Sequence, residues 1–271
     1  NKPSDYVARS TAILFNHENA WSIERQKQNA TWNTMAHIEK YYRTLKSFGA
    51  PVDFITEEKD FNRYPVMIVP AYQLADEPLV SRWVDYVRKG GNLVVTCRTA
   101  QKDRYGRLPE AAFGSLINGL TGNKMDFYDL LLPGDPGLVK MDGKEYQWNT
   151  WGEILIPGET SEVWATYQKE FYDGKPAVTH YKLGKGSVTY VGVDSFDGKL
   201  EAEILKKLYA RLGIGVQSLP YGVTMEYRNG LGIVLNYSDQ PYQFTLPKGG
   251  KVLIGNTLIS TAGVLVFKLN N

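Results

Sequence analysis

The sequence has few of the residues on which disulfides, metal sites and nucleophilic catalysis usually depend. Cysteine occurs once, as Cys97, and histidine three times, as His17, His37 and His180. A single cysteine excludes an internal disulfide and a cysteine-based zinc site. Three widely spaced histidines do not predict a histidine-rich metal centre. We therefore expect no metal ion and no cofactor.

Strong charge and long apolar runs are also missing. The 31 basic and 29 acidic residues give a formal net charge of +2, and no block of five basic residues occurs, so no nucleic-acid partner is predicted. No apolar run approaches the ~20 residues of a membrane-spanning helix, and the polar N-terminus, NKPSDYVARS, lacks a signal-peptide core. These absences predict no membrane contact and a cytoplasmic location.

What the sequence does contain is an alternation of strand and helix signals over its first two thirds. Continuous apolar strands separated by helices favour a parallel α/β sheet with helices on both faces. The strands are predicted at residues 12–15, 52–55, 66–69 and 93–95.

Two helices in this region have clear signals. The first is predicted at about 30–47, with an apolar stripe of Met35, Ile38, Tyr42 and Leu45. The second is predicted to begin after Asp76, an N-cap residue, and to end at the glycine pair 90–91. Its expected buried residues are Leu79, Trp83, Tyr86 and Val87.

The stretch 100–160 is rich in turn signals and longer than an ordinary connection, which indicates a role of its own. It contains one predicted short helix near 110–119, with Phe113, Leu116, Ile117 and Leu120 as its apolar residues. Strands at 161–167, 177–183 and 187–193 and a helix at about 199–212 follow.

From about residue 217 the apolar period changes to two, which is typical of antiparallel strands. Val223, Met225 and Tyr227 precede the turn dipeptide 229–230, and Ile233, Leu235 and Tyr237 follow it, so a hairpin is predicted with these residues pointing inward. We expect shorter strands at 242–246, 251–254 and 264–269 to complete a small β domain.

Cys97 follows the strand at 93–95, where a nucleophile could stand. A nucleophile elbow needs small residues two positions to either side, but Val95 and Thr99 occupy those places. A thiolate also needs a base, and the late predicted strand at 187–193 is followed by Asp194, with no histidine nearby. We expect a buried, non-catalytic thiol; a Cys97–His17 pair is the alternative.

Two further groups of residues are candidate binding sites. The first predicted strand is followed by Asn16, His17 and Glu18. Together with Arg98 these residues could line a pocket at the strand ends, although we favour a turn that caps the next helix. Trp148 and Trp151 form the best local aromatic pair. We favour a subunit interface for them over sugar stacking, since tryptophan is enriched in interfaces.

Short motifs along nearly the whole chain carry a family resemblance. They occur in family order, with no single motif decisive: AILFNHENAW at 12–21, YYR at 41–43, GAPVD at 49–53, VRKGGNLVVT at 87–96, GKPAVT at 174–179, GKG at 184–186, YVG at 190–192 and NYSD at 236–239. The chain resembles the trimerisation and C-terminal domains of the family-42 glycoside hydrolases, the β-galactosidases. Its strand-and-helix order also resembles the class I glutamine amidotransferase fold.

The resemblance implies a flavodoxin-like, amidotransferase-like domain at residues 11–215 and an antiparallel β domain at 217–271, after a linker at 1–10 from a missing barrel. In the family that (β/α)₈ barrel supplies both catalytic carboxylates for retaining hydrolysis of β-galactosides, so no catalytic residue is transferred here. Cys97 becomes a degenerate nucleophile position, and Asp194 stands where the histidine is missing.

The function implied for these residues is assembly into a homotrimer, with a galactoside bound only through the barrel. Two alternatives belong to other classes. One is a cysteine-dependent amidotransferase-like or peptidase-like hydrolase that uses Cys97. The other is a carbohydrate-binding module that uses Trp148 and Trp151.

Overall fold

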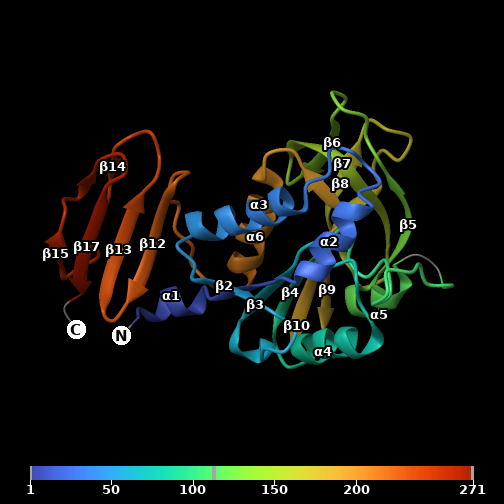
Figure 1. Ribbon diagram of the computed structural model, residues 1–271, viewed down its shortest axis with the longest axis horizontal. Coiled ribbons are helices and arrows are strands. Elements are labelled where there is room, and N and C mark those ends of the chain that lie inside the picture. The colour runs from blue at the N-terminus through green and yellow to red at the C-terminus, as the bar shows by residue number, and fades with distance from the viewer. Residues whose placement is uncertain (1, 112–113, 270–271) are drawn as a thin grey trace. The chain divides into compact units, whose positions relative to one another are not determined.

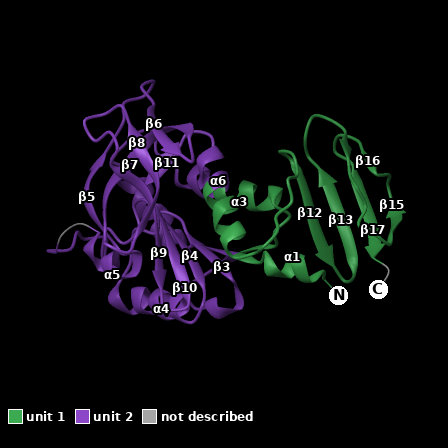
Figure 2. Ribbon diagram, turned by 180° about the vertical axis from the view of Figure 1, so that it is seen from behind, with its two compact units in different colours: residues 1–11, 41–53, 204–271 green, residues 12–40, 54–203 purple. Residues whose placement is uncertain are grey.

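The computed structural model describes residues 2–111 and 114–269 and divides the chain into two compact units (Figures 1 and 2). Unit 1 combines residues 1–11, 41–53 and 204–271, and unit 2 combines residues 12–40 and 54–203. Among the described residues, every helix is too short or too polar to span a lipid bilayer.

A large mixed sheet forms most of unit 2. Its strand order is β11-β7-β6-β8-β9-β10-β4-β3-β1-β2, and β5 pairs with β7. Strands β3, β4 and β10 run parallel, whereas β9 pairs antiparallel with β10. The strands are β1 (Thr11–Leu14), β2 (Val52–Ile55), β3 (Val66–Val69), β4 (Asn92–Thr96), β5 (Asn123–Asp129), β6 (Gly137–Met141), β7 (Lys144–Pro157), β8 (Glu162–Gln168), β9 (Pro176–Leu183), β10 (Gly186–Val191) and β11 (Val193–Ser195).

Helices and short 3₁₀ turns make up the rest of the regular structure in the described residues. They are α1 (Ser4–Ala8), α2 (His17–Arg25), α3 (Thr34–Ser47), α4 (Glu77–Arg88), α5 (Asn118–Thr121) and α6 (Lys199–Arg211), with 3₁₀ turns η1 (Phe61–Arg63) and η2 (Ser115–Ile117). The predicted helix near 110–119 is therefore reduced to η2 and α5. Phe113, assigned to it from sequence, lies outside the described residues.

Helix α4 confirms its sequence signals. The Asp76 carboxylate accepts a hydrogen bond from the Leu79 N–H at 3.0 Å, as an N-cap does. The residues expected to be buried all pack into the main core beside β4. Gly91 must be glycine, because a Cβ there would collide with the Tyr86 ring.

Three other elements differ from the sequence expectations. On α3, Ile38 and Leu45 are buried, but Met35 and Tyr42 are exposed, so the predicted stripe is half wrong. Helix α2 was not predicted. The stretch 100–160 is not mainly turns: β5, β6 and β7 extend the sheet by antiparallel pairing, which makes the sheet mixed rather than parallel.

The C-terminal part of unit 1 is a four-stranded antiparallel sheet, order β12-β13-β17-β15, accompanied by the two-stranded pair β14-β16. Asn229 and Gly230 both have positive φ, as the predicted hairpin turn requires. The strands are β12 (Val223–Arg228), β13 (Leu231–Asn236), β14 (Tyr242–Gln243), β15 (Gly250–Ile254), β16 (Leu258–Ile259) and β17 (Val264–Leu269).

One detail of unit 1 corrects the sequence analysis, and another adds to it. On β13 the inward residue is Val234, which is fully buried, whereas Tyr237 is 71% exposed, so the predicted register was wrong by one residue. The segment expected to be a linker contains α1, and its Tyr6 is buried edge-on against Tyr227, with ring centroids 4.9 Å apart.

Candidate functional site at the end of strand β4

The ends of β3 and β4 carry strained backbone. Ala71, Arg98 and Ala100 all have positive φ, a region that non-glycine residues rarely adopt. Cys97 itself lies outside that region and donates its N–H to Val191 O at 2.7 Å. Strain of this kind gathers at functional sites, so these strand ends are the place to examine for chemistry.

The Cys97 thiol is enclosed in apolar surroundings. Its side chain is fully buried in a cluster with Ile23, Trp32, Ala71 and Trp151. Among the described residues none forms a hydrogen bond to its sulfur. Burial raises the pKa of the thiol well above its ordinary value, and nearby acidic groups raise it further. The thiol is therefore neutral near pH 7 and is not a prepared nucleophile.

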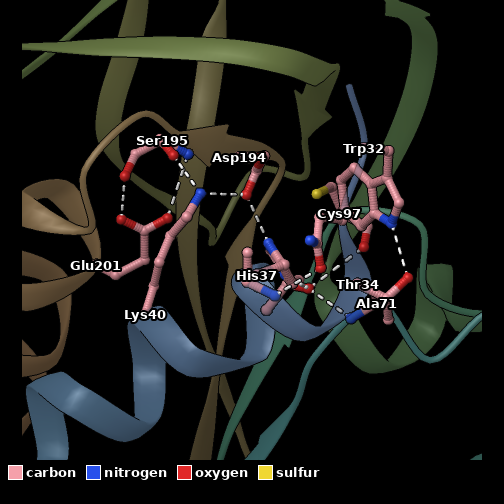
Figure 3. A network of polar contacts seen from close by, with 12 residues as sticks. Trp32, Thr34, His37, Lys40, Ala71, Cys97, Asp194, Ser195 and Glu201 are labelled. Atoms are coloured by element: carbon pink, nitrogen blue, oxygen red, sulfur yellow. Dashed lines mark hydrogen bonds and ion pairs between the residues drawn. The ribbon is translucent and has the colours of Figure 1, made fainter. Parts of the chain in front are cut away.

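The His37 side chain, on α3, lies near Cys97 at the strand ends, but its hydrogen bonds go to groups other than the thiol (Figure 3). Its Nδ1 lies 2.7 Å from Asp194 Oδ1, and its Nε2 lies 2.9 Å from Thr96 Oγ1. The Thr96 oxygen also accepts the Ala71 N–H at 2.7 Å. Both ring nitrogens of His37 are thus engaged, so His37 does not act as a base for the thiol.

Lys40 completes this network one helical turn along α3. Its Nζ lies 2.7 Å from Asp194 Oδ1 and also donates to the Ser195 carbonyl. Burial by itself would raise the pKa of Asp194, but the hydrogen bond from His37 and the charge of Lys40 outweigh it, so the pKa is lowered. Burial likewise opposes the charge on Lys40, yet Asp194 and Glu201 hold its pKa above the ordinary value.

Glu201, the second acidic residue of this network, lies on α6. It accepts hydrogen bonds from the Ser195 N–H, at 3.2 Å, and from the Ser195 hydroxyl. The end of β11 is therefore fixed by two helices, α3 and α6 (Figure 3). The network ties elements together and leaves no free acid or base.

Glu153, on β7, is a further buried carboxylate at these strand ends. It accepts the Arg98 N–H at 2.8 Å, the Gln101 amide at 2.8 Å, the Trp151 indole at 3.1 Å and the Tyr190 hydroxyl at 2.6 Å. Burial raises its pKa, and these hydrogen bonds act in the opposite direction. The sequence analysis missed Glu153 because β7 was not predicted.

The Arg98 side chain is also enclosed at these strand ends. Its guanidinium lies between Trp32 and Trp151, with Cζ 4.6 and 4.5 Å from the two ring centroids. It also donates to the Lys27 carbonyl at 2.9 Å and to the Gln26 carbonyl at 3.3 Å. The guanidinium is held as part of the core rather than presented to a ligand.

The residues expected to share a strand-end pocket with Arg98 are placed differently. Asn16 caps α2 by accepting the N–H groups of Glu18, at 2.7 Å, and Asn19, at 3.2 Å. His17 and Glu18 are exposed on the first turn of that helix, whereas Arg98 is fully buried. Within the described ranges, no hydrogen bond, ion pair or ring contact joins Arg98 to these three residues.

Trp148 and Trp151 are both fully buried. Trp148 packs edge-on against Tyr167, with ring centroids 5.5 Å apart, and Trp151 stacks on Tyr128 at 4.6 Å. Neither indole presents a face to a sugar or to another subunit, so we no longer assign an interface to this pair. In the part of the chain that the structure describes, no cluster of three potential metal ligands occurs.

Comparison with known protein families identifies the chain. A family model described as the β-galactosidase trimerisation domain matches residues 9–218, and one described as the β-galactosidase C-terminal domain matches residues 222–269. The chain belongs to glycoside hydrolase family 42. This confirms the resemblance drawn from the motifs at 12–21, 49–53 and 87–96.

Relatives in this family are longer proteins. The β-galactosidase BgaH of Haloferax lucentense is 29% identical over 255 residues, which cover 94% of this chain and 38% of BgaH. The β-galactosidase LacA of Lactobacillus acidophilus is 30% identical over 211 residues, which cover 77% of this chain and 31% of LacA. The chain thus spans less than two fifths of the length of these family-42 relatives.

Solved family-42 structures share the fold. The β-galactosidase of Halorubrum lacusprofundi matches 95% of this chain and 39% of its own, with a TM-score of 0.85 and 25% identity. The enzyme from Bacillus circulans sp. alkalophilus matches 96% of this chain and 41% of its own, with a TM-score of 0.83 and 22% identity. The predicted fold class, an α/β sheet followed by a small antiparallel domain, is confirmed.

Proposed function

We propose that these residues assemble the subunits of a family-42 β-galactosidase and do not themselves catalyse a reaction. The observation that carries the proposal is the closed strand-end site. Cys97 is buried with a raised pKa, and both nitrogens of His37 are bonded to other groups. A site with no accessible nucleophile and no free base favours a structural role for the domain.

The description of the matching family, a trimerisation domain, supports self-association. We propose a homotrimer, organised by a domain at residues 11–215 that is followed by the β domain at 217–271. We further propose that Cys97 and Asp194 mark the degenerate active site of an amidotransferase-like ancestor. Hydrolysis of terminal β-galactosides would then belong to catalytic carboxylates elsewhere in the longer enzyme.

The test is the molar mass of the chain in solution, measured by light scattering behind gel filtration. The subunit mass is 30.6 kDa, and we expect a species of about three times that value. A monomer at every concentration up to ~100 µM, well above the Kd range of stable complexes, would overturn the assembly role.

Activity measurements separate the remaining alternatives. With a chromogenic β-galactoside we expect no turnover above the buffer rate. Hydrolysis of an amide or ester substrate that is lost in Cys97→Ala would instead favour the cysteine hydrolase. Saturable quenching of tryptophan fluorescence by galactose or lactose would favour the carbohydrate-binding module.

A further inference from the structure

An aromatic patch, defined here as Phe15, His17, Trp21 and Phe54, lies where β1, α2 and β2 meet in unit 2. The Phe15 ring is 4.9 Å from the His17 ring and 6.4 Å from the Phe54 ring, both edge-on. The His17 and Trp21 rings, one helical turn apart on α2, are 5.8 Å apart. The four rings therefore form one continuous cluster.

Two of the four rings in this patch are largely exposed to solvent. Trp21 is 62% exposed and Phe54 is 51% exposed. The chain has six tryptophans, and the other five, Trp32, Trp83, Trp148, Trp151 and Trp164, are at most 5% exposed. Exposed aromatic clusters of this kind mark interaction surfaces, and tryptophan is the residue most enriched among the energetic centres of interfaces.

The elements beneath the patch hold it rigidly. Asn16 caps the first turn of α2, and Asn19, on the same helix, donates to the Ala71 carbonyl at 3.0 Å. Phe54 lies on β2, the last strand at one end of the large sheet, where pairing groups face outward. By contrast Phe171, which is 86% exposed, lies in a turn between β8 and β9. A preformed surface binds with less loss of conformational entropy.

The charges beside Trp21 favour a partner of mixed charge. Glu18, Glu24 and Arg25 lie three or four positions from Trp21 and share its face of α2. Glu24 is already paired with Lys27 at 2.7 Å. The rim of the patch thus carries charges of both signs, and some of them are already paired. Such a rim does not attract a strongly charged partner. A second copy of this chain, whose net charge is only +2, is electrostatically compatible with it.

The area of the patch fits the centre of such an interface. A fully exposed aromatic side chain offers about 150–250 Å², so Trp21 and Phe54 together expose roughly 200 Å². A standard interface covers about 800 Å² on each partner, of which an energetic centre is the smaller part. We propose that the aromatic patch is the centre of the contact between copies of this chain, an inference that rests on the proposed assembly function.

Iodide quenching of tryptophan fluorescence tests this on the wild-type chain, with Trp21→Phe as the control. In the assembled chain we expect the six tryptophans to be protected. On dilution below the dissociation midpoint, found by light scattering, an iodide-accessible fraction should emerge, and it should be absent from Trp21→Phe. If an assembled chain keeps the Trp21 fraction accessible, the patch is free in the oligomer and the inference is overturned.

Sedimentation velocity of charged variants gives the second test. Trp21→Glu and Phe54→Glu should dissociate the oligomer, and Trp21→Ala should weaken it by roughly thirtyfold, as loss of an energetic centre does. Phe171→Glu, an equally drastic change at another exposed aromatic, should leave the oligomer intact. Far-ultraviolet circular dichroism checks that each variant is folded.

The two proposals fail in different ways. A wild-type chain that is monomeric at all concentrations overturns the assembly function, and this inference with it. A wild-type oligomer that Trp21→Glu and Phe54→Glu leave unchanged overturns only the inference and shows that copies meet through another surface. Equal dissociation by Phe171→Glu also overturns the assignment to this patch.

Discussion

His37 Nδ1 and Asp194 Oδ1 lie 2.7 Å apart, although 157 positions separate the two residues in the chain. The contact joins α3 to the end of β11, beside the buried Cys97. Its position and chemistry resemble those of a catalytic pair, but the second nitrogen of His37 is bonded to Thr96 instead of the thiol. What remains is a buried polar connection between two elements.

Removing the charge of Asp194 should destabilise the chain strongly. The Asp194 side chain is 10% exposed and bonds both His37 and Lys40. Asp194→Asn leaves the Lys40 charge without its partner, and breaking a buried pair in this way typically costs about 3–5 kcal/mol. Urea unfolding followed by circular dichroism at pH 7 measures the loss in the free energy of unfolding.

Asp197→Asn is the matched control, since it is also an aspartate paired with a lysine. The Asp197 side chain is 38% exposed and its partner Lys199 is 77% exposed, so solvent screens the pair. We expect a loss of at most about 1 kcal/mol. Equal losses in the two variants would contradict the role assigned to the buried network.

The contribution of Asp194 should depend on pH in the acid range. Its folded-state pKa is lowered, so the carboxylate stabilises the fold above the unfolded pKa of about 3.9 and loses that effect as the pH falls through the lower folded value. The difference in unfolding free energy between wild type and Asp194→Asn should therefore be constant above about pH 5 and shrink below about pH 4. Lys40, whose pKa is raised, changes the pH dependence of the unfolding free energy only at alkaline pH. Urea unfolding of both proteins at a series of pH values tests this; a difference that widens toward acid pH would contradict it.

Local signals were enough to predict much of the fold. The Asp76 cap, the glycines after α4 and the Asn229-Gly230 turn each act over a few residues, so their physical effect is visible in the sequence. The register of β13 was not predictable in this way. Ile233 and Val234 are both apolar, and only the packing of the other strands decides which of them points inward.

The candidate site depends on contacts that no local pattern contains. His37 and Asp194 meet because α3 packs against the sheet edge, and Glu153 reaches the same strand ends from β7. The sequence did show that Cys97 follows a buried strand. It also showed that Asp194 stands where a catalytic histidine would be needed. It gave no sign that two tryptophans would enclose Arg98, since Trp32 and Trp151 are 119 positions apart.

The Cys97 thiol should react very slowly in the folded chain. It is fully buried and burial raises its pKa, so both access and thiolate fraction are low. With iodoacetamide at pH 7.5 we expect labelling at least ~100-fold slower than that of an exposed thiol, because reaction requires local opening. Mass spectrometry follows the modification.

The comparison thiol is Ser81→Cys in a Cys97→Ala background, since Ser81 is exposed on α4. Denatured wild type should label at the same rate as this exposed thiol. Fast labelling of folded wild type that is lost in His17→Ala or His37→Ala would show instead that a histidine activates Cys97.

Arg98→Lys should destabilise the chain even though the charge is kept. The planar guanidinium lies between Trp32 and Trp151 and donates to two backbone carbonyls, and an ammonium group cannot reproduce both contacts. A desolvated cation–π contact contributes about 2 kcal/mol or more, so we expect the free energy of unfolding to fall by at least that amount.

Arg107→Lys is the control, because Arg107 also lies over an aromatic ring, that of Tyr105 at 5.1 Å, but its side chain is 72% exposed. There the loss should stay below about 1 kcal/mol. Equal effects in the two variants would mean that the buried arrangement of Arg98 adds nothing to stability.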